Sequence, residues 1–179
     1  MPARVLALLP FSFFLLAAFV NARAGTLHNL FWVCNVMNLV LAASLAARWP
    51  RGIWIATLWL LTGTPLWLWD AILTNVFDVH SFLTHVAAAG LGVWALFRTP
   101  RPRHLWWQAV LAAIALQLVT RALTPPETNV NVAFAAYGPV ARALPGLAAW
   151  YPLAWAVNIA TFCVTMLVLD TALARITKR

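Results

Sequence analysis

Six apolar runs, each close to the length of a bilayer-spanning helix, dominate this sequence of 179 residues. A transmembrane helix needs about 20 consecutive apolar residues, because the hydrocarbon core of a bilayer is about 30 Å thick. The runs cover residues 5–20, 27–47, 52–73, 81–97, 105–123 and 147–169. We therefore predict one all-α domain over residues 1–179, a polytopic membrane bundle of about six transmembrane helices.

The composition excludes a water-soluble globular fold. Hydrophobic residues make up 64% of the chain and charged residues only 9%, and the mean hydropathy is +0.84. Soluble domains carry about 25% charged residues. A chain this apolar has too little polar surface to face water, so lipid must surround most of its side chains.

Proline and charge separate the runs. Pro65 is the exception, because it falls inside the third run, where it predicts a kink in the helix. The prolines that coincide with breaks are Pro50, Pro100, Pro102, Pro125 and Pro126.

The basic residues indicate the orientation. They lie at the ends of the runs and form no patch, which favours contact with membrane lipids and argues against nucleic acid as a partner, despite a net charge of +8. The positive-inside rule then predicts cytoplasmic N- and C-termini and a multi-pass protein of the cell (inner) membrane, with homo- or hetero-oligomers left open. The predicted inner segments hold Arg4, Arg48, Arg51, Arg98, Arg101, Arg103, Arg175, Lys178 and Arg179; the outer ones hold Arg23, Arg121 and Arg142.

The first run has two interpretations. The small residues around Ala22 and Ala24 resemble a signal-peptide cleavage site, but only Arg4 and the amino terminus charge its start. The run is also long for a signal peptide, so we favour an uncleaved first helix.

Polar residues gather at the predicted outer ends of the helices. Buried polar groups are costly in a membrane and mark functional sites, so this asymmetry predicts a polar site at the outer boundary. The candidates are His28, Cys34, Asn35, Asn38, Asp70, Asp78, His80, Thr84, His85, Arg121, Asn129 and Asn131.

The first functional interpretation is an acyl-transferase or hydrolase. A thiol or hydroxyl becomes a nucleophile when a base takes its proton, and a carboxylate can orient that base. Amide groups can stabilise the developing oxyanion. In this hypothesis the nucleophile is Cys34 or Thr84, the base is His85 or His28, the orienting residue is Asp70 or Asp78, and the amides belong to Asn35 and Asn38.

Two other interpretations use overlapping residues. His28, His80 and His85 with an aspartate have the ligand types that zinc or iron prefers, but no HExxH-type spacing supports a metal, so we predict neither metal nor cofactor. A non-catalytic lipid or solute binder, transporter or assembly subunit is the main alternative. There Arg121 would bind an anionic head group, and Asn129, Asn131 and the helix asparagines would line a polar cavity.

Structural roles also account for single residues. Intramembrane asparagine and histidine often only join helices, and a buried Cys34 can be packing. Asn129 and Asn131 are typical of turns. Asp170 is expected to pair with Arg175 near the end of the last helix.

Three segments resemble the YwaF-like conserved integral membrane proteins. The stretch 27–35, Leu-His-Asn-Leu-Phe-Trp-Val-Cys-Asn, is similar to a helix start of the LPLHLC type in that family. The stretch 81–85, Ser-Phe-Leu-Thr-His, resembles a later histidine-bearing helix start. Residues 124–139, with Asn129-Val130-Asn131 and Gly138-Pro139, resemble the outer loop before the last span.

That family is similar to a eukaryotic six-span group reported to act as phospholipid acyltransferases, and more distantly to androgen-induced-type intramembrane hydrolases with a Thr/His pair. The resemblance implies Cys34 as nucleophile and His85 as its partner. The sequence departs from the family motif in the position of His28 relative to Cys34, and in Asn35, which replaces a frequent acid.

Overall fold

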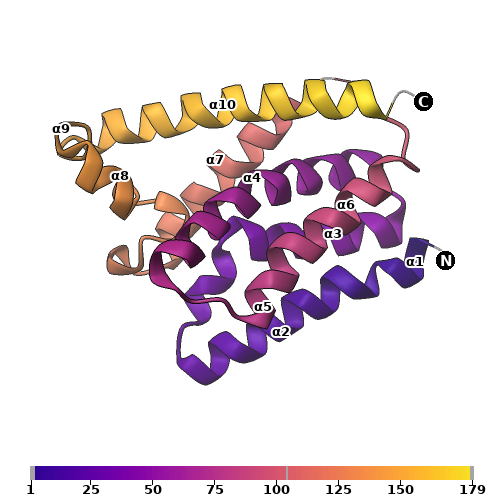
Figure 1. Ribbon diagram of the computed structural model, residues 1–179, viewed down its shortest axis with the longest axis horizontal. Coiled ribbons are helices and arrows are strands. Elements are labelled where there is room, and N and C mark those ends of the chain that lie inside the picture. The colour runs from indigo at the N-terminus through magenta and orange to yellow at the C-terminus, as the bar shows by residue number, and fades with distance from the viewer. Residues whose placement is uncertain (1–2, 104, 178–179) are drawn as a thin grey trace.

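The protein is a helical bundle (Figure 1). The computed structural model describes residues 3–103 and 105–177, and this part contains helices but no strands, which confirms the predicted all-α class. In chain order the elements are α1 (Ala3–Leu6), α2 (Leu8–Ala24), η1 (Leu27–Phe31), α3 (Val33–Ala47), α4 (Pro50–Thr74), α5 (Val79–Phe82), η2 (Leu83–Ala87), α6 (Ala88–Leu96), α7 (Trp106–Leu123), η3 (Pro126–Thr128), η4 (Val130–Val132), α8 (Gly138–Ala143), α9 (Pro145–Ala148) and α10 (Tyr151–Ile176).

Five helical stretches are long and apolar enough to cross a membrane, which is the arrangement of a multi-pass membrane protein. They are Arg4–Ala24, Pro50–Thr74, Val79–Leu96, Trp106–Leu123 and Tyr151–Ile176. The second predicted run is shorter than expected, because residues 27–31 form the 3₁₀-helix η1 and Trp32 is extended, with ψ at 136°. Only the 15 residues of α3 remain as α-helix in that run.

Helix ends follow local chemistry. Pro50 occupies the first turn of α4, where its missing N–H costs nothing, and α4 continues through Pro65 to Thr74. The last helix differs from the predicted range 147–169, because α8 and α9 occupy the preceding connection and α10 covers Tyr151–Ile176.

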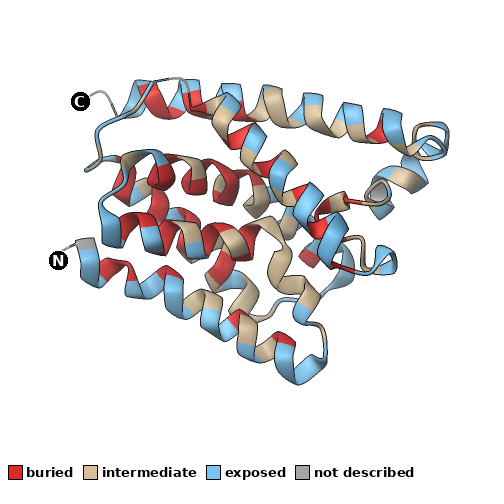
Figure 2. Cartoon of the chain, turned by 180° about the vertical axis from the view of Figure 1, so that it is seen from behind, coloured by how far each residue is buried: buried red, intermediate tan, exposed pale blue. Residues whose placement is uncertain are grey.

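Helix α4 lies at the centre of the packing. Trp54, Leu58 and Leu60 on this helix are fully buried, and the indole Nε1 of Trp59 donates a 2.8 Å hydrogen bond to the carbonyl of Ala109 on α7. The outer helices keep much of their surface exposed (Figure 2). In α10 only 11% of the most apolar window is buried, so its leucine and valine side chains are available to lipid.

Small residues let α6 approach α4 closely. Ala88, Ala89, Gly92 and Ala95 are all buried. A Cβ added at Gly92 would lie 2.6 Å from Oγ1 of Thr57. This is the close backbone packing that small residues permit between membrane helices.

Both chain ends lie at one end of the bundle (Figure 1). At that end Arg101 Nη2 donates a 3.0 Å hydrogen bond to Oδ1 of Asp170, whose side chain is 4% exposed. The predicted pairing of Asp170 with Arg175 was therefore wrong, because Arg101 is the partner. The loop after α6 carries Arg101 across to α10, and sequence spacing along one helix cannot reveal such a contact.

Candidate functional site

A cavity of about 480 Å³ lies where the later parts of α2 and α4 meet η1, the start of α3, and α5–η2. We call it the polar cavity. Its polar side chains come from five separate segments of the chain: Asn21, Asn29, Cys34, Asn35, Asp70, His80, Ser81, Thr84, His85 and Tyr137.

Half of the twelve predicted site residues line this cavity, namely Cys34, Asn35, Asp70, His80, Thr84 and His85. Asn38 and Asp78 are not lining residues themselves, but each contacts one: Asn38 bonds to the carbonyl of Thr84, and Asp78 contacts His80. His28, Arg121, Asn129 and Asn131 lie elsewhere. His28 is on η1, and the extended Trp32 separates it from α3, so the helical face that His28 was expected to share with Asn35 does not form.

His85 is held on a π-helical turn. Its Nδ1 lies 2.8 Å from the carbonyl oxygen of Ser81, and its ring stacks on Trp67 with centroids 5.1 Å apart and 12° between the planes. A carbonyl only accepts hydrogen bonds, so Nδ1 carries the proton and Nε2 of the neutral ring is an acceptor. Within the described residues no partner occupies Nε2. Single π-turns of this kind are frequent at functional sites.

The Thr84 hydroxyl is already engaged. Its Oγ1 donates to the carbonyls of His80 and Ser81, at 3.1 Å each, and the residue is 2% exposed. A hydroxyl that is used within its own helix is a poorly placed nucleophile. The Thr84 Oγ1 also lies 3.3 Å from Nδ1 of His85, but this nitrogen carries the ring proton and cannot act as a base toward the hydroxyl. Of the two candidate nucleophiles, Cys34 is therefore the better placed one.

Cys34 is a free thiol in the first turn of α3, and it lines the polar cavity. Asn38 fixes this turn against the π-turn, because its Nδ2 donates to the carbonyls of both Cys34 (2.9 Å) and Thr84 (2.8 Å). The amide thus acts as a clamp that joins the backbone of the thiol to the residue beside His85. Both hydrogen bonds of this amide go to main-chain carbonyls, which is a structural role and differs from the predicted role as an oxyanion donor.

Asp78 orients a different histidine from the one predicted. Its Oδ1 caps α5 by accepting the N–H of Ser81 at 2.8 Å, and the same oxygen contacts Nδ1 of His80. Among the residues that the structure describes, Nε2 of His80 has no partner, and His80 lines the cavity. Asp78 and His80 therefore form one unit beside His85.

Asp70 is paired with a tyrosine from the connection before the last helix. The Tyr137 hydroxyl donates a 2.9 Å hydrogen bond to Oδ1 of Asp70. Partial burial, followed by this hydrogen bond and the carboxylate charge, raises the pKa of Tyr137 from 10.0 to about 12. Tyr137 was missed in the sequence, because nothing in its neighbourhood predicts contact with α4.

An asparagine chain lines another wall. Asn35 Nδ2 donates to the carbonyl of Asn29 at 2.9 Å, and Asn29 Nδ2 donates to Oδ1 of Asn21 at 3.2 Å. Asn21 and Asn29 were also missed as lining residues. Their amide groups give the cavity a polar wall that lies beyond the predicted catalytic residues.

Two of the remaining candidates, Arg121 and Asn129, have structural partners. Arg121 donates to the carbonyl of Ala133 and lies over the rings of Phe134 and Tyr151. Asn129 Oδ1 accepts the N–H groups of Phe134 and Ala135, which is a turn-forming role. Arg121 does not line the polar cavity, and the turn role expected for Asn129 is present.

The described residues contain no cluster of three or more histidine, cysteine or acidic side chains able to hold a metal. Compared with protein-family models, curated proteins and solved structures, the chain matches none of them. The polar cavity is therefore the feature of this protein that bears on its function.

Proposed function

We propose that this protein is a membrane enzyme that transfers or hydrolyses the acyl group of an amphipathic lipid-like molecule. One observation carries the proposal: Cys34 and His85 line the same cavity, and His85 is held with Nε2 available as a base. A positioned nucleophile and base are the minimum for covalent acyl transfer.

The chemistry proceeds in two steps. The Cys34 thiol gives its proton to Nε2 of His85 while sulfur attacks the ester carbonyl. The carbon–oxygen bond breaks, a thioester forms, and the leaving alcohol takes the proton from the imidazolium. Water or an acceptor hydroxyl then attacks the thioester, with His85 again as base, and restores the thiol. The Asn35 amide lines the cavity and can donate to the oxyanion.

A burst assay tests this proposal. Purified protein in detergent is mixed with p-nitrophenyl butyrate, and released nitrophenolate is followed by absorbance while intact mass reports the acyl group. We expect a stoichiometric burst and a butyryl adduct on Cys34. Cys34→Ala should abolish both, and His85→Gln should slow the burst about 100-fold.

Cys163 provides the matched control, because it is the other free cysteine and lies on α10 away from the polar cavity. Cys163→Ala should keep the burst. A burst that survives Cys34→Ala, or an adduct on Cys163 alone, would contradict the proposal.

A second candidate is non-catalytic lipid binding. Cys34 is only 9% exposed, and thiols so shielded are often inert. In that case the asparagine wall and the Asp70–Tyr137 pair would hold a polar head group without any bond being broken. Bound lipid that co-purifies and is lost in Asn21→Leu, with no burst from the wild type, would favour this function.

We also propose six crossings in the cell (inner) membrane, with α3 as the short sixth and both termini in the cytoplasm. The nine-to-three distribution of basic residues supports this orientation. The polar cavity would then face the outer leaflet. Reporter fusions at the C-terminus and within residues 124–137 test it: a C-terminal fluorescent protein should be bright and a loop alkaline phosphatase active, and the reverse pattern would contradict it.

A further inference from the structure

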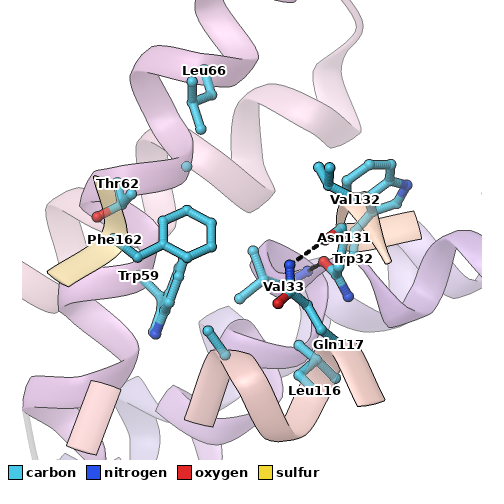
Figure 3. A pocket seen from close by; sticks show the side chains of 12 residues that line it. Trp32, Val33, Trp59, Thr62, Leu66, Leu116, Gln117, Asn131, Val132 and Phe162 are labelled. Atoms are coloured by element: carbon cyan, nitrogen blue, oxygen red, sulfur yellow. Dashed lines mark hydrogen bonds between the residues drawn. The ribbon is translucent and has the colours of Figure 1, made fainter. Parts of the chain in front are cut away.

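A second, apolar pocket, whose lining residues are drawn in Figure 3, shares part of its lining with the polar cavity. It measures about 100 Å³, and we call it the apolar pocket. It lies between α3, α4, α7 and α10, with Trp59 and Phe162 forming one wall in edge-to-face contact, 4.8 Å between ring centroids. Both spaces are bordered by the same five residues: Trp32, Val33, Gly63, Leu66 and Val132.

The polar side chains of the apolar pocket are satisfied by the protein itself. Gln117 donates to the carbonyl of Asn131 and accepts from the indole of Trp155. Asn131 accepts the N–H of Val33 and donates to the carbonyl of Phe31, and Thr62 donates to its own helix. Water would therefore find few free partners there, and such spaces favour hydrocarbon.

Gly63 stands at the junction of the two spaces. A Cβ added at this position would meet no atom within 4 Å, so there is open space where a side chain at position 63 would lie. Leu66, one turn further along α4, also borders both spaces and is 57% exposed. Since this stretch of α4 belongs to a membrane-crossing helix, the junction is accessible from the lipid side.

We infer that the apolar pocket holds a short hydrocarbon chain of the substrate while the polar cavity holds its ester and head group. This inference rests on the proposed function, and it names the substrate class as an amphipathic ester with a short acyl chain. A pocket of about 100 Å³ has room for roughly seven to ten carbons, given about 10–15 Å³ of such volume for each water-sized group. A longer chain would have to extend through the junction toward lipid.

Alkyl methanethiosulfonates test the inference without requiring turnover. In a Cys163→Ala background, methyl and butyl reagents are compared for the rate at which they modify Cys34, measured by intact mass. We expect the butyl reagent to react about tenfold faster than the methyl reagent, because its chain is bound in the apolar pocket. Gly63→Leu should abolish this preference by filling the junction.

Gly90→Leu is the matched control, because Gly90 is also a helical glycine with open space around its Cβ, and it borders neither space. It should keep the butyl preference. Equal rates for both reagents in the wild type, or a preference that survives Gly63→Leu, would overturn the inference while leaving the accessible Cys34 of the proposed function intact. Failure of even the methyl reagent to reach Cys34 would overturn both.

Discussion

Asn131 and Val33, far apart in the sequence, are joined by a hydrogen bond that begins α3: Asn131 Oδ1 accepts the Val33 N–H at 2.8 Å. The same side chain donates to the carbonyl of Phe31 at 2.6 Å and to Oγ1 of Thr120 at 3.0 Å. A loop side chain thus satisfies an orphan N–H at the start of the helix that carries Cys34. The contact also holds Val33, which lines both the polar cavity and the apolar pocket.

Removal of this side chain should destabilise the protein. Asn131 has a φ of +56°, so Asn131→Gly removes the hydrogen bonds without backbone strain. We expect a loss of about 2 kcal/mol, because buried backbone groups lose their partners. The measurement is unfolding in mixed micelles with increasing SDS.

The control for that variant is Asn158→Ala on α10. The Nδ2 of Asn158 is buried with no hydrogen-bond partner within the described residues, so its removal should be neutral or slightly stabilising. Equal losses in the two variants would show that the Asn131 contacts are unimportant.

The Asp70–Tyr137 pair predicts a titration above neutral pH. The Tyr137 pKa is raised to about 12, so its contribution to stability is complete below pH 10 and is lost as the pH rises from about 10 to 12. Absorbance at 295 nm should show Tyr137 ionising late, with Tyr137→Phe assigning the step. Asp70→Asn removes a charge that disfavours the phenolate, so the step should move to lower pH; an unchanged step would argue against the pair.

A side chain added at Gly92, where α6 packs against α4, should lower the stability of the protein. Gly92→Ala places a Cβ against Thr57, and we expect a loss of about 1–3 kcal/mol from overpacking. Gly90→Ala on the same helix has open space and should gain slightly from helix propensity. SDS unfolding of the two variants compares them directly, and equal stability would contradict the packing.

The Arg101–Asp170 ion pair should contribute more to stability than the nearby Arg98. Arg101→Gln leaves a carboxylate buried without its partner, at a cost of about 3 kcal/mol, and adding Asp170→Asn should restore most of it. Arg98 is exposed and lies over Trp94, so Arg98→Gln should change stability by less than about 1 kcal/mol. A large loss in Arg98→Gln, or no rescue in the double variant, would contradict this account.

The sequence was informative where chemistry is local. Long apolar runs and helix-stopping prolines predicted the five helices that are long and apolar enough to cross a membrane, because burial in lipid imposes length and hydropathy on each segment separately. The grouping of Cys34, Asp70 and His85 at one end of the bundle also followed from the sequence, because successive helices run in opposite directions. In these cases each residue carries its own signal.

The rest depended on contacts between distant segments. The loop residue Asn131 ends η1 and begins α3, which shortened the second helix and separated His28 from Asn35. The π-turn that positions His85 has no sequence signature that we recognised. Tyr137, which directly precedes α8, bonds to Asp70 on α4 from 67 positions away in the sequence, so its place in the cavity could not be read from spacing.

Cys34 and His85 line one shared cavity, and a crosslink between the two positions tests this most directly. In a Cys163→Ala background, His85→Cys is treated with a short bifunctional methanethiosulfonate, and intact mass distinguishes one bridging reagent from two separate adducts. We predict an intramolecular bridge from Cys34 to position 85, and none to position 90 in Gly90→Cys. Two separate adducts at 34 and 85, or equal bridging to both positions, would contradict the shared cavity.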